Sequence, residues 1–136
     1  MEKLVHGGDV YSLGEEYAGT ILDFSANINP LGLPDGVRQA AARSLEKCAQ
    51  YPDPLCRELR GALGARLGLD PEEILCGNGA ADLIFRLALA LRPRRGLVPV
   101  PTFAEYAQAM AAAGCSVEEY PLREEDDFRL TPEILE

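Results

Sequence analysis

The sequence predicts an α/β fold, in which helices flank a partial and mostly parallel sheet. Two strand-like runs, 97–100 and 116–120, are separated by a helix-like segment over 101–113. This order is typical of a βαβ unit, in which the crossover helix joins two parallel strands. A third strand-like run, 74–76, leads through a glycine turn into an apolar helix that ends at Pro93. The alternation of strands and helices therefore indicates the fold class.

Composition limits the partners that the chain can bind. Its 136 residues are 47% apolar and 26% charged, as in an ordinary globular protein with one core. The net charge of −9 argues against binding to nucleic acid or to an anionic membrane surface, because both require basic residues. The sequence has no apolar run long enough to span a membrane, and its first residues lack the apolar core of a signal peptide. We therefore expect a cytoplasmic protein.

The cysteines and the single histidine do not suggest a metal site. The four cysteines form no Cys-x-x-Cys pair, and His6 is distant from them in sequence. Disulfides are not expected in a reducing cytoplasm. We expect Cys48 and Cys115 to be small buried residues at the edges of helices or strands, as free cysteines usually are.

Residues 1–34 are predicted to form an extended arm. The stretch 22–34 alternates poorly and contains two prolines and a glycine, which oppose regular structure. Its apolar side chains, from Phe24 to Leu33, argue against disorder. A long ordered segment of this kind is usually functional.

Two helices are predicted to follow the arm. Asp35 can cap a helix that runs to about Cys48. Asp53 can cap a second helix that has Pro54 at its first position, and Gly68 would end it. Apolar residues recur every three or four positions, which gives each helix one apolar face. These residues are Val37, Ala41, Leu45 and Cys48 in the first helix, and Leu55, Leu59, Leu63 and Leu67 in the second.

A capped turn and a glycine turn precede the third helix. Asp70 and Glu73 have the spacing of a capping box, and Gly77-Asn78-Gly79 follows the run 74–76. The N–H groups at a helix start lack intrahelical partners and carry the positive end of the macrodipole, so this turn suits a phosphate. The alternative is a strand-to-helix turn without a ligand, because glycine turns of this kind are common.

The remaining segments complete the expected order of elements. Pro99 lies inside the strand-like run 97–100 and predicts an edge strand or a short pairing. The acidic run 124–127 predicts a solvated loop. Thr131-Pro132-Glu133 has the pattern of a helix start, although only three residues follow it. From this pattern we expect the sequence to be part of a longer protein.

Five motifs, taken in order, resemble the N-terminal part of one enzyme family. The motifs are His6-Gly7-Gly8, Asp23 to Gly32, Tyr51-Pro52-Asp53, Gly77-Asn78-Gly79 and Pro101 to Tyr106. They are similar to the threonine-phosphate decarboxylases, the pyridoxal-phosphate enzymes of cobalamin side-chain synthesis. Histidinol-phosphate aminotransferases are close relatives in the same fold-type I superfamily, and they resemble the second motif only at its Asn-Pro-Leu-Gly end. The second motif is therefore the most specific one.

The resemblance implies how the cofactor, pyridoxal 5′-phosphate, would be bound. Backbone N–H groups of the turn and helix start would hold its phosphate, and these are the groups of Gly79, Ala80 and Ala81. Phe103 would stack on the pyridine ring, for which a flat apolar face suffices. Tyr51 would reach across a homodimer interface to the phosphate of the other subunit's cofactor. At the position of Ala81 the family often has a hydroxyl residue, whereas alanine leaves only the backbone contact.

The resemblance also implies the substrate and the domain organisation. Residues 1–34 would line the substrate pocket, and residues 35–136 would be part of the large domain of a PLP-dependent transferase. His6 and Asn29 would contact the phosphate or the carboxylate of a small phosphorylated amino acid. The implied reaction is decarboxylation of L-threonine O-3-phosphate to aminopropanol phosphate. The alternative is amino transfer, as in histidinol-phosphate aminotransferases or other class I and II aminotransferases.

The catalytic lysine of such an enzyme is not expected among these residues. Pyridoxal phosphate works through a lysine that forms a Schiff base with it. The sequence contains only Lys3, in the arm, and Lys47, on the polar side of a predicted helix. Neither is expected in a buried setting that would activate an amine. We therefore expect no catalytic residue in this chain and no activity from it alone. An alternative of a different class is a non-catalytic binding domain that keeps the phosphate turn.

Overall fold

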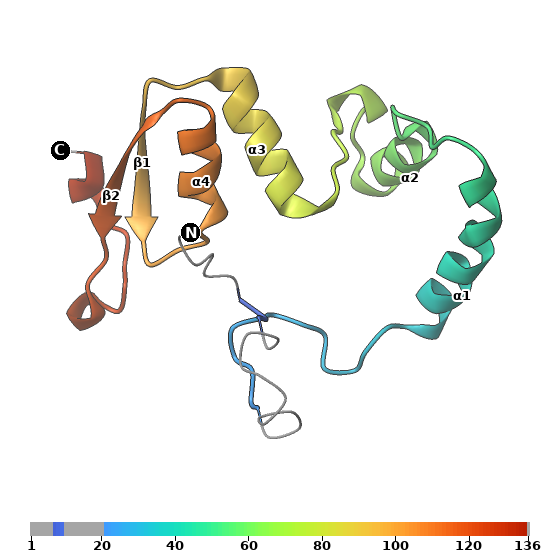
Figure 1. Ribbon diagram of the computed structural model, residues 1–136, viewed down its shortest axis with the longest axis horizontal. Coiled ribbons are helices and arrows are strands. Elements are labelled where there is room, and N and C mark those ends of the chain that lie inside the picture. Colours follow the sequence, from blue (N-terminus) through green and yellow to red (C-terminus); the bar gives the residue numbers. More distant parts are fainter. Residues whose placement is uncertain (1–6, 10–20, 136) are drawn as a thin grey trace. The chain divides into compact units, whose positions relative to one another are not determined.

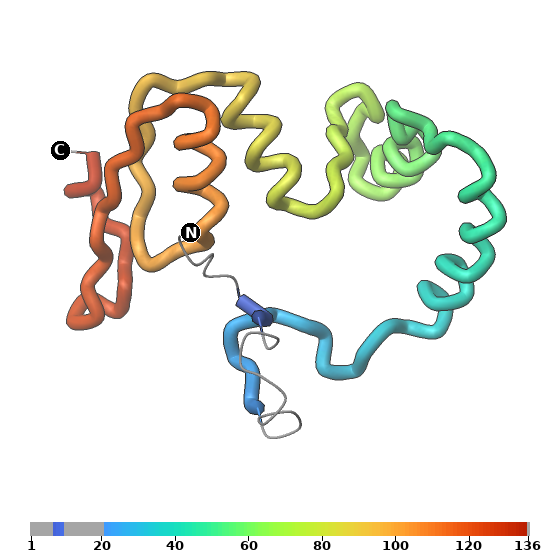
Figure 2. Tube along the Cα trace, in the orientation of Figure 1, coloured from blue at the N-terminus to red at the C-terminus, as the bar shows by residue number. Residues whose placement is uncertain are grey.

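The computed structural model describes residues 7–9 and 21–135, and the chain falls into two units that are described separately (Figures 1 and 2). The first unit is Met1–Cys56 and the second is Arg57–Glu136. The predicted division into an arm and a transferase domain at residues 34 and 35 stays a prediction.

In the first unit, an irregular arm leads into one helix. Residues 21–34 contain no helix or strand, as their prolines and glycine predict (Figure 1). Helix α1 (Asp35–Ser44) begins after Pro34, whose carbonyl oxygen accepts the first helical N–H groups at 3.0 Å. A short 3-10 helix, η3 (Leu45–Ala49), continues it. The predicted helical stretch is thus confirmed, with a change of helix type near its end.

One prediction about this helix is wrong. Asp35 is its first helical residue and not its cap, because Pro34 occupies the N-cap position. The carboxylate of Asp35 instead lies 3.9 Å from Arg38 Nε. The apolar residues from Val37 to Cys48 are exposed, because no other described element of this unit covers them.

Helix α2 (Arg57–Leu67) begins later than the sequence predicts. The Asp53-Pro54 pair lies in a turn, in which Asp53 Oδ1 accepts the N–H of Leu55 at 3.1 Å. Cys56 has a φ of 48°, and a residue in this left-handed conformation cannot continue a helix. The predicted cap at Asp53 is therefore wrong. Gly68, at φ +71°, follows the end of the helix as predicted.

Helix α2 is tied to the turn that follows it. The 3-10 turn η4 (Pro71–Glu73) is capped by Asp70, whose Oδ1 accepts the N–H of Glu72 at 2.9 Å. Arg60 Nε donates to the carbonyl oxygen of Pro71 at 2.7 Å, and its Nη2 lies 3.0 Å from Glu72 Oε1. The capped turn is thus confirmed, although its capping bond lies one residue earlier than a capping box would place it.

Arg60 is expected to stabilise the second unit. Its side chain is only 14% exposed and makes two charge-assisted contacts, so Arg60→Ala should lower the free energy of unfolding by about 1–2 kcal/mol. Glu72→Gln is the control, because the Glu72 side chain is 84% exposed, and it should cost less than about 1 kcal/mol. Urea unfolding measures both changes. Equal losses in the two variants would show that only the exposed ion pair matters.

Residues 74–76 do not form a strand, so that prediction is wrong. A strand is stabilised by hydrogen bonds to a neighbouring strand, and neither described strand pairs with this segment. The backbone nevertheless enters the glycine turn where the sequence predicts it. Helix α3 (Gly79–Leu91) follows and stops at Arg92, whose backbone is left-handed, directly before Pro93.

A βαβ unit follows α3 in the second unit (Figure 1). Strands β1 (Arg95–Val100) and β2 (Ser116–Pro121) are parallel, with Pro99 opposite Tyr120. Helix α4 (Glu105–Ala112) connects them and packs against α3 and both strands. The predicted parallel pairing is confirmed, while α4 begins later than its sequence predicts. Within the part of the chain that is described, β1 has a partner strand on one side only, as Pro99 led us to expect.

The core is small and lies where α4 packs against α3 and the sheet. The buried apolar residues are Ala88, Val98, Ala109 and Cys115. The burial of Cys115 confirms its prediction, whereas Cys48 is exposed and the prediction for it is wrong. All four cysteines are free thiols.

The C-terminal segment is mostly loop. Residues 123–129 are exposed, as predicted, and contain one 3-10 turn, η5 (Glu124–Asp126). The predicted helix start at Thr131 leads into a single 3-10 turn, η6 (Pro132–Leu135). No helix in the described residues is both long enough and apolar enough to cross a membrane.

Candidate functional site

The glycine turn leaves donors open at the start of α3. Asn78 occupies the N-cap position, and its side chain makes no capping bond. The N–H of Gly79 donates to the carbonyl oxygen of Gly77 at 2.9 Å. The N–H groups of Ala80 and Ala81 have no hydrogen-bond acceptor among the described residues. Two donors at the positive end of a helix macrodipole can therefore bind an anion.

Both glycines of the turn are required, for different reasons. Gly79 has a φ of +84°, a conformation that other residues adopt only with strain. Apart from Gly79 itself, its chain neighbours and the local helix backbone, no atom lies within 4 Å of the position that a Cβ would take there, so a bound group has room. At Gly77 a Cβ would lie 2.7 Å from Leu83 Cγ and 2.9 Å from Asp82 Oδ2, which is too close for any side chain. The open side and the two donors together fit a phosphate group.

A carboxylate and a guanidinium hold this turn in place. Asp82 Oδ2 accepts the N–H of Asn78 at 2.8 Å, and Asp82 Oδ1 accepts a hydrogen bond from Arg86 Nε at 2.9 Å. The two side chains are 29% and 54% exposed. Sequence reasoning missed this pair, although a spacing of four residues on a helix could have indicated it. The bond to Asn78 depends on the shape of the turn, which the spacing does not show.

Phe103 lies in the loop between β1 and α4. Its ring meets the ring of Tyr106 edge-on, with centroids 5.8 Å apart, and it is 44% exposed. Both strands end on the side of the sheet where α3 and α4 begin, so the loop between β1 and α4 lies on the same side as the start of α3 (Figure 1). Ligands of α/β proteins bind at the carboxyl ends of parallel strands. The start of α3 and the loop after β1 therefore lie at the side of the sheet where such ligands bind, and the cofactor roles of Gly79, Ala80, Ala81 and Phe103 stay predictions.

Glu105 is the buried charged residue of this region. It is 3% exposed and begins α4, directly after the Phe103 loop. The N-terminal end of a helix stabilises an anion, which offsets part of the cost of burying a carboxylate. A glutamate at a helix start is common, so no sequence signal marked this one as buried.

Two N-terminal motifs contact each other in the first unit. The N–H of Gly8 donates to Ser25 Oγ at 2.8 Å. Ser25 in turn donates its hydroxyl and its N–H to Asp23 Oδ1, at 2.5 and 2.8 Å. A Cβ at Gly7 would overlap the carbonyl oxygen of Ser25. We call the contacts among Gly7, Gly8, Asp23 and Ser25 the arm clasp, because they join the Gly7-Gly8 segment to the arm.

The arm clasp depends on an ionised Asp23. The hydrogen bond from the Ser25 side chain, followed by that from its backbone, lowers the pKa of Asp23 below its ordinary value of 3.8. Since the folded-state pKa is the lower one, the clasp is stabilising above pH 3.8 and is lost as the pH falls through the folded-state pKa. We expect the NMR shift of the Ser25 amide, which donates to Asp23 directly, to show an acid transition below pH 3.8 that is absent in Asp23→Asn. A transition above pH 3.8 that disappears in Asp23→Asn, or an acid transition that persists in Asp23→Asn, would contradict this.

Asn29 closes a turn farther along the arm. Its Nδ2 donates to the carbonyl oxygen of Gly32 at 2.9 Å, and its Oδ1 accepts the N–H of Leu31 at 3.1 Å. An amide carries two N–H protons, so this turn does not use all of its donors. The two bonds account for an asparagine at this position of the Asn-Pro-Leu-Gly pattern without a ligand. The second N–H of the Asn29 amide remains for a contact with a substrate.

The other predicted site residues precede the second unit in the sequence. Tyr51 is fully exposed and, like Asn29, belongs to the first unit. The glycine turn and Phe103 belong to the second unit. His6 lies outside the described residues. The roles of these residues stay predictions.

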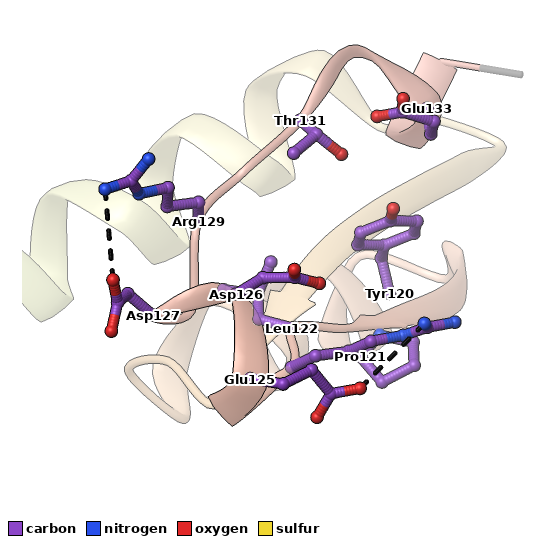
Figure 3. Close-up of a pocket in the computed structure, with 10 residues that line it drawn as sticks. Tyr120, Pro121, Leu122, Glu125, Asp126, Asp127, Arg129, Thr131 and Glu133 are labelled. Atoms are coloured by element: carbon purple, nitrogen blue, oxygen red, sulfur yellow. Dashed lines mark ion pairs between the residues drawn. The ribbon is translucent and has the colours of Figure 1, made fainter.

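A hollow of about 680 Å³ lies beside β2 and the C-terminal turn (Figure 3). It is lined by Tyr120, Pro121, Leu122, Arg123, Glu125, Asp126, Asp127, Arg129, Thr131 and Glu133. Its arginines pair with its own acids, Arg129 with Asp127 at 3.8 Å and Arg123 with Glu125 at 4.0 Å. No predicted site residue lines it. No cluster of three or more metal-ligating side chains occurs here or elsewhere in the described ranges.

Comparison with known sequences identifies relatives over nearly the whole chain. The family model "Aminotransferase class I and II" matches residues 19–136. A threonine-phosphate decarboxylase from Salmonella typhimurium is 40% identical over 134 residues, which are 96% of this chain and 37% of that protein. A histidinol-phosphate aminotransferase from Anoxybacillus flavithermus is 32% identical over 107 residues, which are 77% of this chain and 29% of that protein. The chain thus spans about a third of the length of these relatives.

Solved structures show the same relationship. The L-threonine-O-3-phosphate decarboxylase from Porphyromonas gingivalis matches 65% of this chain with a TM-score of 0.60 and 31% identity, over 27% of its own length. The histidinol-phosphate aminotransferase from Clostridium acetobutylicum matches 76% of this chain with a TM-score of 0.62 and 34% identity, over 31% of its length. The helices and the two-stranded parallel sheet match part of these fold-type I structures, which confirms the predicted fold class. The chain therefore belongs to the class I and II aminotransferase family, whose members depend on pyridoxal phosphate.

Proposed function

We propose that the chain is part of a pyridoxal-phosphate enzyme that decarboxylates L-threonine O-3-phosphate to aminopropanol phosphate. The main support is the identity of 40% over 96% of the chain to a threonine-phosphate decarboxylase. The identity to a histidinol-phosphate aminotransferase is lower, 32% over 77%. The arm clasp adds support, because it joins the two motifs that resemble the decarboxylases most specifically.

The second unit provides the cofactor contacts in this proposal. The N–H groups of Ala80 and Ala81 bind the cofactor phosphate, and Gly79 leaves the space for it. Phe103 lies against the ring and excludes water from that face. Tyr51 crosses to the other subunit of a homodimer, for which its full exposure in this chain leaves it available. When bound, pyridoxal phosphate supplies an electron-withdrawing ring that allows a bond to the α-carbon of an amino acid to break.

The N-terminal arm provides the substrate contacts. Residues 1–34 line the substrate pocket, where His6 and Asn29 bind the phosphate or the carboxylate of the substrate. The Asn29 amide suits this task, because its remaining N–H can donate to an anionic oxygen. The arm clasp joins Gly8, two residues after His6 in the sequence, to Ser25, four residues before Asn29, so we propose that it helps to determine where these contacts are made.

The covalent step needs a lysine that we do not assign within this chain. Lys47 is exposed on η3, and Lys3 lies outside the described residues. We propose that neither serves, that the 136 residues alone are inactive, and that the complete enzyme works in the cytoplasm. An absorbance shift of the cofactor on mixing with this chain alone, of the kind that a lysine adduct gives, would contradict this part of the proposal.

Amino transfer is the second candidate. The solved histidinol-phosphate aminotransferase covers more of this chain, 76% against 65%, at a slightly higher identity than the solved decarboxylase. The structural comparison therefore does not favour decarboxylation, whereas the sequence comparison does. We give more weight to the latter, because it extends over the specific arm motifs.

An assay of the full-length protein distinguishes these functions. The protein is supplied with pyridoxal phosphate and L-threonine O-3-phosphate, and we expect CO₂ and aminopropanol phosphate as products. Amino transfer from histidinol phosphate to 2-oxoglutarate, without CO₂ release, would support the second candidate. Cofactor binding without either reaction would support a non-catalytic binding protein.

A further inference from the structure

We propose that Asp82 and Arg86 form a positioning pair that shapes the phosphate-binding turn and keeps it neutral for an incoming phosphate. This inference rests on the proposed function, because it concerns the same cofactor phosphate. Neither side chain is assigned a contact with the cofactor. Their effect is exerted through the backbone of the turn and through their charges.

Asp82 gives the turn its shape. Its Oδ2 accepts the N–H of Asn78 at 2.8 Å, which fixes the residue that precedes Gly79. The same oxygen lies 2.9 Å from the position of a Cβ on Gly77, so the carboxylate packs directly against the turn. Because Asp82 occupies the N–H of Asn78, the donors left to an anion are those of Ala80 and Ala81.

This arrangement brings a negative charge to an anion site. Asp82 lies in the first turn of α3, where the macrodipole that stabilises its carboxylate is the one that attracts a phosphate. Its side chain is 29% exposed, so water and salt screen its charge less than on an open surface. An unpaired Asp82 would therefore repel the phosphate that the turn is built to bind.

Arg86 removes this repulsion. Its Nε donates to Asp82 Oδ1 at 2.9 Å, while the other carboxylate oxygen stays on Asn78. The guanidinium therefore neutralises the carboxylate without taking it from the turn. A pair at this spacing could equally serve only to stabilise the helix. The second contact of Asp82, with the N–H of Asn78, distinguishes it from such a pair and links it to the phosphate site.

Two substitutions separate charge from shape. Arg86→Gln leaves the Asp82 charge unpaired, and we expect it to weaken the binding of pyridoxal phosphate about tenfold in the full-length protein. Asp82→Asn keeps an oxygen that can accept the N–H of Asn78 and leaves Arg86 as an unpaired cation, so the affinity should stay equal or rise. The double variant should recover affinity to within about twofold of the wild type. Such recovery would not occur if Arg86→Gln only damaged the helix.

Two controls test whether phosphate charge is the cause. Pyridoxal, which lacks the phosphate, should bind equally to the wild type and to Arg86→Gln. Arg94→Gln removes an exposed arginine beyond the other end of α3 and should leave both affinities unchanged. Equilibrium dialysis measures the affinities, and the loss in Arg86→Gln should shrink as salt is raised from about 0.01 M to 0.5 M.

The outcomes distinguish this inference from the proposed function. A wild type that binds pyridoxal phosphate no better than pyridoxal would refute the phosphate site, and the inference with it. A wild type that prefers pyridoxal phosphate, together with an unchanged Arg86→Gln, would refute the inference alone. So would equal losses for both ligands, or a double variant that stays as weak as Arg86→Gln.

Discussion

Gly77→Ala is expected to weaken both the second unit and its binding of the cofactor. The added Cβ would lie 2.7 Å from Leu83 Cγ and Cδ2 and 2.9 Å from Asp82 Oδ2. Leu83 is half-buried on α3, so it cannot move away without disturbing its neighbours. We expect the free energy of unfolding to fall by about 1–3 kcal/mol, as for other overpacked sites.

Cofactor binding should suffer for a second reason. The Cβ would push Asp82 away from the N–H of Asn78 and change the direction of the donors at the start of α3. We expect the affinity for pyridoxal phosphate to fall at least about tenfold in the full-length protein. Dialysis against the cofactor measures this loss, and urea unfolding measures the change in stability.

Gly61→Ala is the matched control for this substitution. Gly61 lies within α2, and no atom outside its local helix backbone lies within 4 Å of the position of its Cβ. Alanine there should stabilise the protein by about 0.5–1 kcal/mol and leave cofactor affinity unchanged. A Gly77→Ala protein that matched the wild type in stability and affinity would show that the close packing of Gly77 against Leu83 and Asp82 is not required.

The elements that the sequence predicts correctly are those with local signals. Helix α3 is marked by a glycine turn before it and Pro93 after it, and the βαβ unit by the order of its segments. These signals lie within a few residues of the element that they specify. They therefore predict that element even when its tertiary contacts are unknown. The same local signals predicted open N–H donors at the start of helix α3, whereas the assignment of Gly79, Ala80 and Ala81 to the cofactor came from the resemblance.

The predictions that failed depend on neighbours in space. The run 74–76 reads as a strand, but a strand also needs a partner, and neither described strand pairs with it. Asp53 has the sequence of a helix cap, yet a left-handed Cys56 turns the chain before the helix begins.

The site was only partly visible in the sequence for the same reason. The Asp82–Arg86 spacing was visible, but the contact of Asp82 with Asn78 requires the folded turn. The arm clasp joins Gly8 to Ser25, and no periodic pattern connects two residues so far apart in sequence. The resemblance marked the glycine turn and the N-terminal arm as motifs. The structure shows the contacts that these residues make.

Gly7→Ala is expected to impair substrate binding with little effect on cofactor binding. A Cβ at Gly7 would overlap the carbonyl oxygen of Ser25, a backbone atom that no side-chain rotation can move away. The two segments must then separate, and the bond from the N–H of Gly8 to Ser25 Oγ, 2.8 Å in the structure, would be lost. We expect kcat/KM for L-threonine O-3-phosphate to fall between about tenfold and 100-fold in the full-length protein, as for a substrate contact displaced by about 1 Å.

Two further variants show whether the arm clasp causes this loss. Ser25→Ala removes the acceptor of the Gly8 N–H without the overlap, so it should give a smaller loss in the same direction. Gly36→Ala, in α1 with no atom near the position of its Cβ, should leave kcat/KM unchanged. If Gly7→Ala weakened pyridoxal phosphate binding as much as it lowered kcat/KM, the clasp would act on the whole site. A loss confined to the substrate would instead tie the Gly7-Gly8 segment to substrate binding, because the cofactor donors lie in the other unit of the chain.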